Sequence, residues 1–98
     1  MSTKLLEDKK VSLRLNKKYN VIIHNDEVTT FDCVILVLQA VFGYSEDQAV
    51  QTAMLVHIAG SAVVGKYPKD IAETKRFEAM DIAKGEGFPL TLTVEKAL

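Results

Sequence analysis

The sequence predicts a small α+β domain, in which helices pack over one three-stranded sheet in the order β-α-α-β-α-β. The chain has 98 residues, which is enough for a single domain. Hydrophobic residues make up 48% and charged residues 26%, as is usual for a globular protein. Three short runs have the composition or alternation of strands, and three longer segments repeat apolar residues every three or four positions. Three strands and three helices within residues 19–98 suit a two-layer sandwich.

The first strand is predicted at residues 19–24, because this run is rich in β-branched and aromatic residues. It is ended by three turn-forming residues, Asn25, Asp26 and Glu27. A largely buried helix is predicted over residues 30–43. We expect Thr29 to cap this helix, with Asp32 three positions later completing a capping-box-like pattern, and Gly43 to end it.

The second helix is predicted to start at Ser45, since Gln48 stands three residues later in a capping box. It ends near Gly60, and one face is marked by Ala49, Ala53, Val56 and His57. Only Gly43 and Tyr44 separate the first two helices, which predicts a helical hairpin.

The second half of the core continues with a strand at residues 61–67. Pro68 then opens a third helix over residues 69–84, because proline is tolerated at the start of a helix. The residues expected to face inward are Ile71, Ala72, Phe77, Met80 and Ala83. Strict alternation over residues 90–95 predicts a final strand with one buried face.

Charge divides the chain into a basic N-terminal arm, residues 1–18, and an acidic core domain, residues 19–98. The arm has six basic and two acidic residues, and the core has six basic and eleven acidic ones. An acidic core is a poor nucleic-acid surface, and no apolar run is long enough to span a membrane. We therefore expect a protein that binds neither nucleic acid nor membrane, with an arm that is a solvated tail or binds an anion weakly. The single cysteine favours a reducing compartment, so we expect a cytoplasmic protein, with a monomer as the default state.

Catalytic and metal-binding patterns are weak in this sequence. Cys33 and His57 could form a nucleophile–base pair, but Cys33 lies in an apolar helical run, where cysteine usually acts as a small buried hydrophobe. A buried Cys33 without oxyanion donors nearby would dismiss a hydrolase. Ligand spacing for a metal is absent among the candidates His24, His57, Cys33 and Asp26. We expect no enzyme activity, no catalytic residues, no metal and no cofactor.

A polar cluster at the end of the first strand, residues 24–27, is more informative. One interpretation is a solvated turn, with His57 a partly buried histidine elsewhere. The other is a site for a small cationic group, bound by Asn25, Asp26 and His57 beside an apolar hollow between the helices.

Four segments resemble the ClpS family, in family order: residues 19–31, 49–65, 70–75 and 89–97. Each motif is weak by itself, and the four together are specific. The resemblance implies an adaptor, not an enzyme, with the same β-α-α-β-α-β fold. ClpS proteins recognise destabilising N-terminal residues, called N-degrons, and deliver the substrate to a ClpA-type AAA+ unfoldase of the ClpAP protease.

The resemblance also implies roles for individual residues. Asn25, Asp26 and His57 match the positions that receive the α-amino group of the substrate, which is mostly protonated at neutral pH. A first side chain such as Leu, Phe, Tyr or Trp would enter a pocket lined by Thr29, Phe31, Val34, Ala53, Val56 and Leu90. The surface for the unfoldase's N-terminal domain matches Asp70, Glu73 and Lys75, although a charged outer helix face is also ordinary.

Three positions depart from the family pattern: Glu27, Phe31 and Ala53 stand where many members have aspartate, methionine and methionine. We expect the small Ala53 to relax or shift the side-chain preference. The alternative function is a protein–protein interaction domain resembling the ribosomal L7/L12 C-terminal domain. Such a domain would not need Asn25, Asp26 and His57 to converge.

Overall fold

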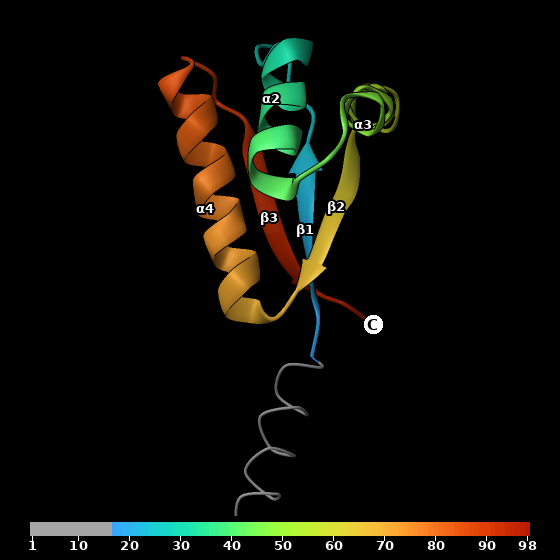
Figure 1. The fold of residues 1–98 in the computed structure, drawn as a ribbon, viewed down its shortest axis with the longest axis vertical. Helices are drawn as coiled ribbons and strands as arrows, with labels where there is room; N and C mark the ends of the chain where they lie inside the picture. Colours follow the sequence, from blue (N-terminus) through green and yellow to red (C-terminus); the bar gives the residue numbers. More distant parts are fainter. Residues whose placement is uncertain (1–16) are drawn as a thin grey trace, which may run out of the picture.

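The computed structural model describes residues 17–98, and its central element is the first strand, β1 (Tyr19–His24). β1 lies between β2 (Ser61–Tyr67) and β3 (Thr91–Lys96) in an antiparallel sheet of order β2-β1-β3 (Figure 1). The helices are α2 (Phe31–Phe42), α3 (Glu46–Ala59) and α4 (Lys69–Gly85). The predicted β-α-α-β-α-β order is thus confirmed, whereas most of the predicted arm lies outside the described residues.

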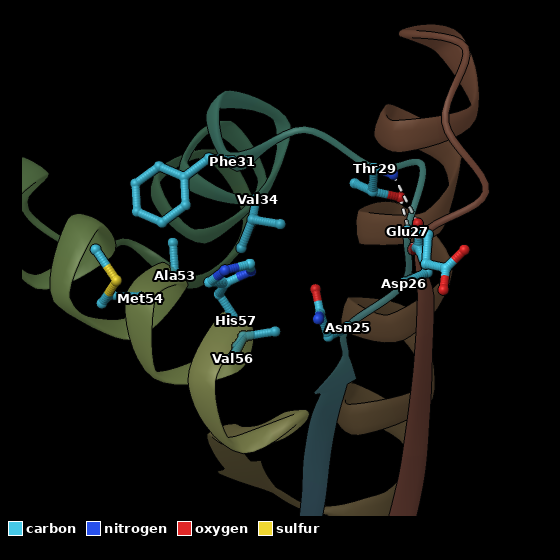
Figure 2. Close-up of a pocket in the computed structure, with 10 residues that line it drawn as sticks. All are labelled: Asn25, Asp26, Glu27, Thr29, Phe31, Val34, Ala53, Met54, Val56 and His57. Carbon is cyan, nitrogen blue, oxygen red and sulfur yellow. Dashed lines mark hydrogen bonds between the residues drawn. The ribbon is translucent and has the colours of Figure 1, made fainter.

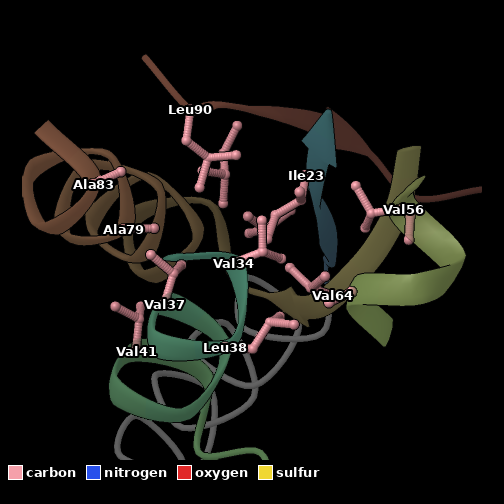
Figure 3. Close-up of a cluster of buried hydrophobic side chains, with 14 of the residues drawn as sticks. Ile23, Val34, Val37, Leu38, Val41, Val56, Val64, Ala79, Ala83 and Leu90 are labelled. Carbon is pink, nitrogen blue, oxygen red and sulfur yellow. The ribbon is translucent and has the colours of Figure 1, made fainter. Parts of the chain in front are cut away.

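The helices cover one face of the sheet and build the core there (Figures 1 and 3). Alternate residues of β1, Val21 and Ile23, are fully buried on this face. They pack in one cluster with buried residues of α2, α3, α4 and β3. The largest fully buried side chains of this cluster include Val37, Leu38, Val56 and Leu92. Because β1 is paired on both sides over its whole length, the end of β1 is a fixed point from which the next turn departs.

The start of α2 differs by one residue from the prediction. Thr30, not Thr29, is the N-cap, and its hydroxyl accepts a hydrogen bond from the Cys33 backbone N–H. Thr29 is held instead by the preceding turn, where its N–H and hydroxyl both donate to Asp26. By contrast, the capping box of Ser45 and Gln48 at the start of α3 is confirmed.

The first two helices contact one another, but they do not run side by side as a hairpin. Figure 1 shows α2 upright in the view and α3 nearly end-on, so that α3 lies across α2. Gly43 ends α2 with a φ of 70°, a conformation that glycine adopts without strain. This turn directs the chain away from the axis of α2.

The inward face of α4 was predicted incorrectly at its two largest residues. Ile71 is 45% exposed and Phe77 is 67% exposed, whereas Ala72, Ala79 and Ala83 are fully buried. Small side chains let the helix backbone lie close to α2 and the sheet, which explains why alanines face inward here. Among the described residues, no helix has both the length and the apolar content needed to cross a membrane.

Candidate functional site

A pocket of about 550 Å³ lies between the turn after β1, the start of α2 and the end of α3 (Figure 2). One side is polar and comes from the turn; the other is mostly apolar and comes from the two helices. The lining residues are Asn25, Asp26, Glu27, Thr29, Phe31, Val34, Ala53, Met54, Val56 and His57. Figure 2 shows Asn25 and His57 on either side of the same space, although they are far apart in the chain.

One backbone hydrogen bond joins the two parts of the pocket. The Asn25 N–H donates to the carbonyl of Gly60 over 2.8 Å. Gly60 caps α3 with a φ of 91°, a conformation that favours glycine. His57 is in the last turn of α3, so this bond holds His57 beside the end of β1.

Asp26 organises the polar side through three hydrogen bonds. Its Oδ1 accepts from the backbone N–H groups of Val28 and Thr29, at 2.8 and 2.6 Å, and its Oδ2 accepts from the Thr29 hydroxyl at 2.7 Å. Partial burial acts to raise the pKa of this carboxyl, but the hydrogen bonds from Thr29 and Val28 outweigh it and lower the pKa below its usual 3.8. Asp26 therefore carries a negative charge at neutral pH.

The apolar side combines buried and exposed residues. Val34, Ala53 and Val56 are buried and form its inner surface, while Phe31 and Met54 are exposed at its outer edge. In Figure 2 the ring of Phe31 lies on the side of Ala53 and Met54. The pocket thus presents an anionic group and polar atoms next to an apolar surface, which suits a ligand that has a cation beside an apolar side chain.

Most of the residues predicted to form the site lie together. Asn25, Asp26 and His57 all line the pocket, as do the expected apolar residues except Leu90. Leu90 is buried in the core and borders a second hollow, of about 460 Å³, between α4 and the segment before β3. Leu90 thus lies outside the lining of the pocket to which it was assigned, because it borders the hollow beside α4 instead.

Two residues that line the pocket were not among the predicted lining residues, Glu27 and Met54. Met54 lies three residues before His57, so both occupy neighbouring positions on α3. This spacing is a signal by which the sequence could have indicated Met54. Glu27 directly follows Asp26 in the turn, and this position next to a predicted site residue could have indicated that Glu27 lines the pocket.

The residues predicted for the unfoldase surface are in different environments. Asp70 and Glu73 are exposed on α4, and Glu73 lies 3.5 Å from Arg76 in an ion pair. The ammonium of Lys75 instead donates to the carbonyl of Val41 over 2.8 Å and lies over the Tyr67 ring, 5.8 Å from its centroid. Lys75 thus connects α4 to the last turn of α2.

The geometry does not support a Cys33–His57 pair. Cys33 is buried and borders a separate hollow with Thr30 and Glu86, whereas His57 lines the pocket. Burial raises the pKa of the Cys33 thiol, and the negative charges of Glu86 and Asp26 raise it further. Such a thiol is a poor nucleophile.

No metal site is evident in the part of the chain that the structure describes. His24 donates or accepts a hydrogen bond at Nε2 with the Thr93 hydroxyl, over 2.7 Å, and so belongs to the sheet. Within residues 17–98, no group of three or more histidine, cysteine, aspartate or glutamate residues could hold an ion.

Comparison with known families identifies the relatives of the chain. The family described as "ATP-dependent Clp protease adaptor protein ClpS" matches residues 14–93. The chain belongs to the ClpS family. The ClpS adapter of Neisseria meningitidis serogroup A is 40% identical over 95 residues, which cover 97% of this chain and 90% of that protein. ClpS 2 of Agrobacterium fabrum is 46% identical over 86 residues, 88% of this chain and 84% of that one.

A solved ClpS structure has the same fold. Agrobacterium tumefaciens ClpS2, bound to L-phenylalaninamide, is similar with a TM-score of 0.80 and 47% sequence identity. The match covers 83% of this chain and 98% of the ClpS2 chain. The protein is therefore an adaptor of the Clp protease system, as the resemblance in the sequence implied.

Proposed function

We propose that this ClpS protein binds substrates by a free α-amino group and a large hydrophobic first side chain, and delivers them to a ClpA-type unfoldase. The observation that carries the proposal is the joint presence of Asn25, Asp26 and His57 in one pocket with an apolar surface. It is supported by the ligand of the related ClpS2, because phenylalaninamide carries a free α-amino group and a benzyl side chain.

The polar side suits a protonated amine. An ammonium group has three N–H donors and a positive charge, and it needs acceptors and a compensating anion. Asp26 supplies the charge, while the Asn25 side-chain oxygen and the His57 ring supply further acceptors. Hydrogen bonds to charged groups contribute about 1.5–3 kcal/mol each. The α-amino group of a substrate has a pKa near 8, so binding should weaken above about pH 8.

The apolar side suits the first side chain. Burying a Leu or Phe side chain contributes about 1.5–3 kcal/mol. Together with the amine contacts, and after the peptide end has been ordered, this suggests micromolar affinity, about −8 kcal/mol. Such affinity permits release of the substrate to the unfoldase.

The test is a titration of fluorescent peptides that begin with Phe or Leu, compared with the same peptides acetylated at the N-terminus. Acetylation removes the charge and leaves the side chain unchanged. We expect micromolar binding that is lost on acetylation and is weakened at least tenfold by Asp26→Asn or His57→Ala.

The matched control is Asp32→Asn, which removes an exposed carboxylate from the first turn of α2 without altering the pocket lining. This variant should bind like the unmodified protein. Equal binding of the free and acetylated peptides would contradict recognition of the amine and would favour an interaction domain of the L7/L12 type.

A further inference from the structure

The second hollow, of about 460 Å³ between α4 and the segment before β3, shares no lining residue with the candidate site. We call it the α4 groove. Phe77, Met80 and Phe88 give it an apolar lining. The Phe77 side chain is 67% exposed, so it is not held within the core. An apolar surface of this kind commonly marks a site where another segment binds.

Charged side chains border the same groove. Arg76 and Lys84 both line it, and Met80 lies four residues from each of them, so the three share one side of α4. Arg76 is paired with Glu73 over 3.5 Å, but both side chains are partly exposed and such pairs are weak. One carboxylate, that of Asp81, also lines the groove. The groove therefore suits a segment in which an apolar side chain stands next to an anionic one.

The N-terminal arm contains one segment of this composition. Leu5 and Leu6 are the only adjacent pair of apolar residues among residues 1–18, and the only acidic residues there, Glu7 and Asp8, follow them directly. Two lysines come next in the sequence, which suits the Asp81 carboxylate of the groove. Because residues 5–10 lie outside the described part of the chain, the match is between their sequence and the lining of the groove.

The arm joins the domain beside the start of α4. The ammonium of Lys69, the first residue of α4, lies 6.0 Å from the centroid of the Tyr19 ring. From Lys69 to Lys84 the helix rises about 22 Å, at 1.5 Å per residue. The chain from Asp8 to Lys17 can span about 30 Å when it is extended. Residues 5–8 are therefore within reach of the groove.

We propose that residues 5–8 bind in the α4 groove of the same chain. The two leucines would contact the apolar lining, and the carboxylates of Glu7 and Asp8 would lie near the two cations. The segment is tethered, so its effective concentration is on the order of millimolar and a weak contact suffices. A second copy of the chain is a poorer occupant, because one groove offers far less than the roughly 800 Å² per partner of a stable interface.

The test compares amide NMR spectra of the unmodified full chain with those of the same chain carrying Leu5→Ser and Leu6→Ser. We expect the signals of Phe77, Met80 and Lys84 to shift at least threefold more than those of α3, which does not line the groove. The shifts should be the same after tenfold dilution, because the contact is made within one chain.

Controls exist on both sides of the contact. Val11→Ser with Leu13→Ser removes two apolar residues of the arm outside residues 5–8 and should leave the groove signals unchanged. Phe77→Ser should abolish the response of the other groove signals to the leucine substitutions. Ile71→Ser, at an exposed residue of α4 outside the groove, should preserve that response.

Three results would overturn the proposal. The first is that the groove signals do not respond to the leucine substitutions, and the second is that they respond equally to the control pair in the arm. The third is that the shifts disappear on dilution, which would assign the groove to the arm of a second copy. None of these results depends on substrate binding, so the proposed function is tested separately.

Discussion

Asp26 has two roles that can be separated at the scale of a single residue. Its oxygens accept the hydrogen bonds that close the turn after β1, and its charge faces the pocket. Asparagine keeps one oxygen in place for the backbone N–H groups but has no charge. Asp26→Asn therefore tests the charge with little change in shape.

The lowered pKa of Asp26 predicts a pH dependence of stability. A carboxyl whose pKa is lower in the folded state stabilises the fold above its unfolded pKa, and this contribution is lost as the pH falls through the folded pKa. Asp26→Asn should thus have a lower Tm than the unmodified protein at pH 7, and the difference should close below about pH 4. Thermal melts from pH 3 to pH 7 measure this, and a difference that is constant with pH would contradict it.

The small side chain of Ala53 leads us to predict a broad preference for the first side chain of the substrate. It is buried on the inner surface of the pocket, where a larger side chain would occupy ligand space. We expect the unmodified protein to bind an Ile-initiated peptide within a hundredfold of its Leu-initiated counterpart, and Ala53→Met to lower the affinity for the Ile peptide about tenfold. Anisotropy titrations with Leu, Phe, Trp and Ile peptides measure this. An Ile peptide that binds the unmodified protein more than a hundredfold more weakly than Leu would argue against a relaxed pocket.

At the scale of elements, the sheet and helices are joined by a few close contacts. The ring of Tyr67, the last residue of β2, covers Gly65 and lies near Phe42, 6.4 Å between ring centroids. Lys75 of α4 lies over the same ring and also caps α2. The end of β2, α2 and α4 therefore meet at this tyrosine.

Gly65 is predicted to be intolerant of a side chain. A Cβ atom there would meet two ring carbons and the hydroxyl oxygen of Tyr67, at 2.5, 2.8 and 2.7 Å. Gly65→Ala should displace the ring and lower the free energy of unfolding by about 1–3 kcal/mol, the range for overpacking.

The control is Gly85→Ala at the end of α4, where a Cβ meets nothing within 4 Å. It should stabilise the protein by about 0.5–1 kcal/mol, as alanine does relative to glycine in helices. Denaturant titrations measure both, and an unchanged Gly65→Ala protein would contradict the close packing.

The sequence predicted these elements well where the signal was local. The capping box of Ser45 and Gln48 predicted the start of α3, and the alternation of apolar and polar residues before Lys96 predicted β3. A few neighbouring residues determine each of these patterns. The errors have non-local causes. Thr29 is drawn into the turn by Asp26, and alanines rather than Ile71 and Phe77 face inward because α4 lies close to the sheet.

The candidate site shows the same division. A site formed by Asn25, Asp26 and His57 was one of two interpretations that the residue pattern left open, and the resemblance to ClpS favoured it, although these residues come from separate segments. Leu90 was misplaced because its position depends on the route of the chain from α4 to β3. Residue pattern alone does not determine that route.

At the scale of the whole molecule, the pocket and the start of α4 lie at opposite ends. Figure 1 shows β1 leading to the end where α2 begins, while α4 begins at the other end of the sheet. Asp70 and Glu73 are in the first turns of α4 and are exposed. A substrate in the pocket and an unfoldase domain on this surface could therefore be bound simultaneously.

Charge reversal of this surface should separate delivery from binding. Asp70→Lys with Glu73→Lys should slow degradation of a Phe-initiated substrate by a ClpA-type protease at least fivefold and leave the peptide Kd unchanged. Lys75→Met instead removes the contact to Val41 and should lower the Tm. Degradation assays, peptide titrations and thermal melts distinguish these effects. Normal degradation with the doubly reversed variant would exclude Asp70 and Glu73 from the interface.

The hydrogen bond from Asn25 to Gly60 has a consequence for synthesis of the protein. The turn that carries Asp26 is translated before His57, and it is joined to the end of α3 only when Gly60 accepts the bond from Asn25. β1 also obtains its second neighbour from β3, the last strand of the chain. An unfinished or truncated chain would thus hold only fragments of the pocket. The ability to capture a substrate arises when the domain is complete, so unfinished chains should not compete with finished adaptors for substrates.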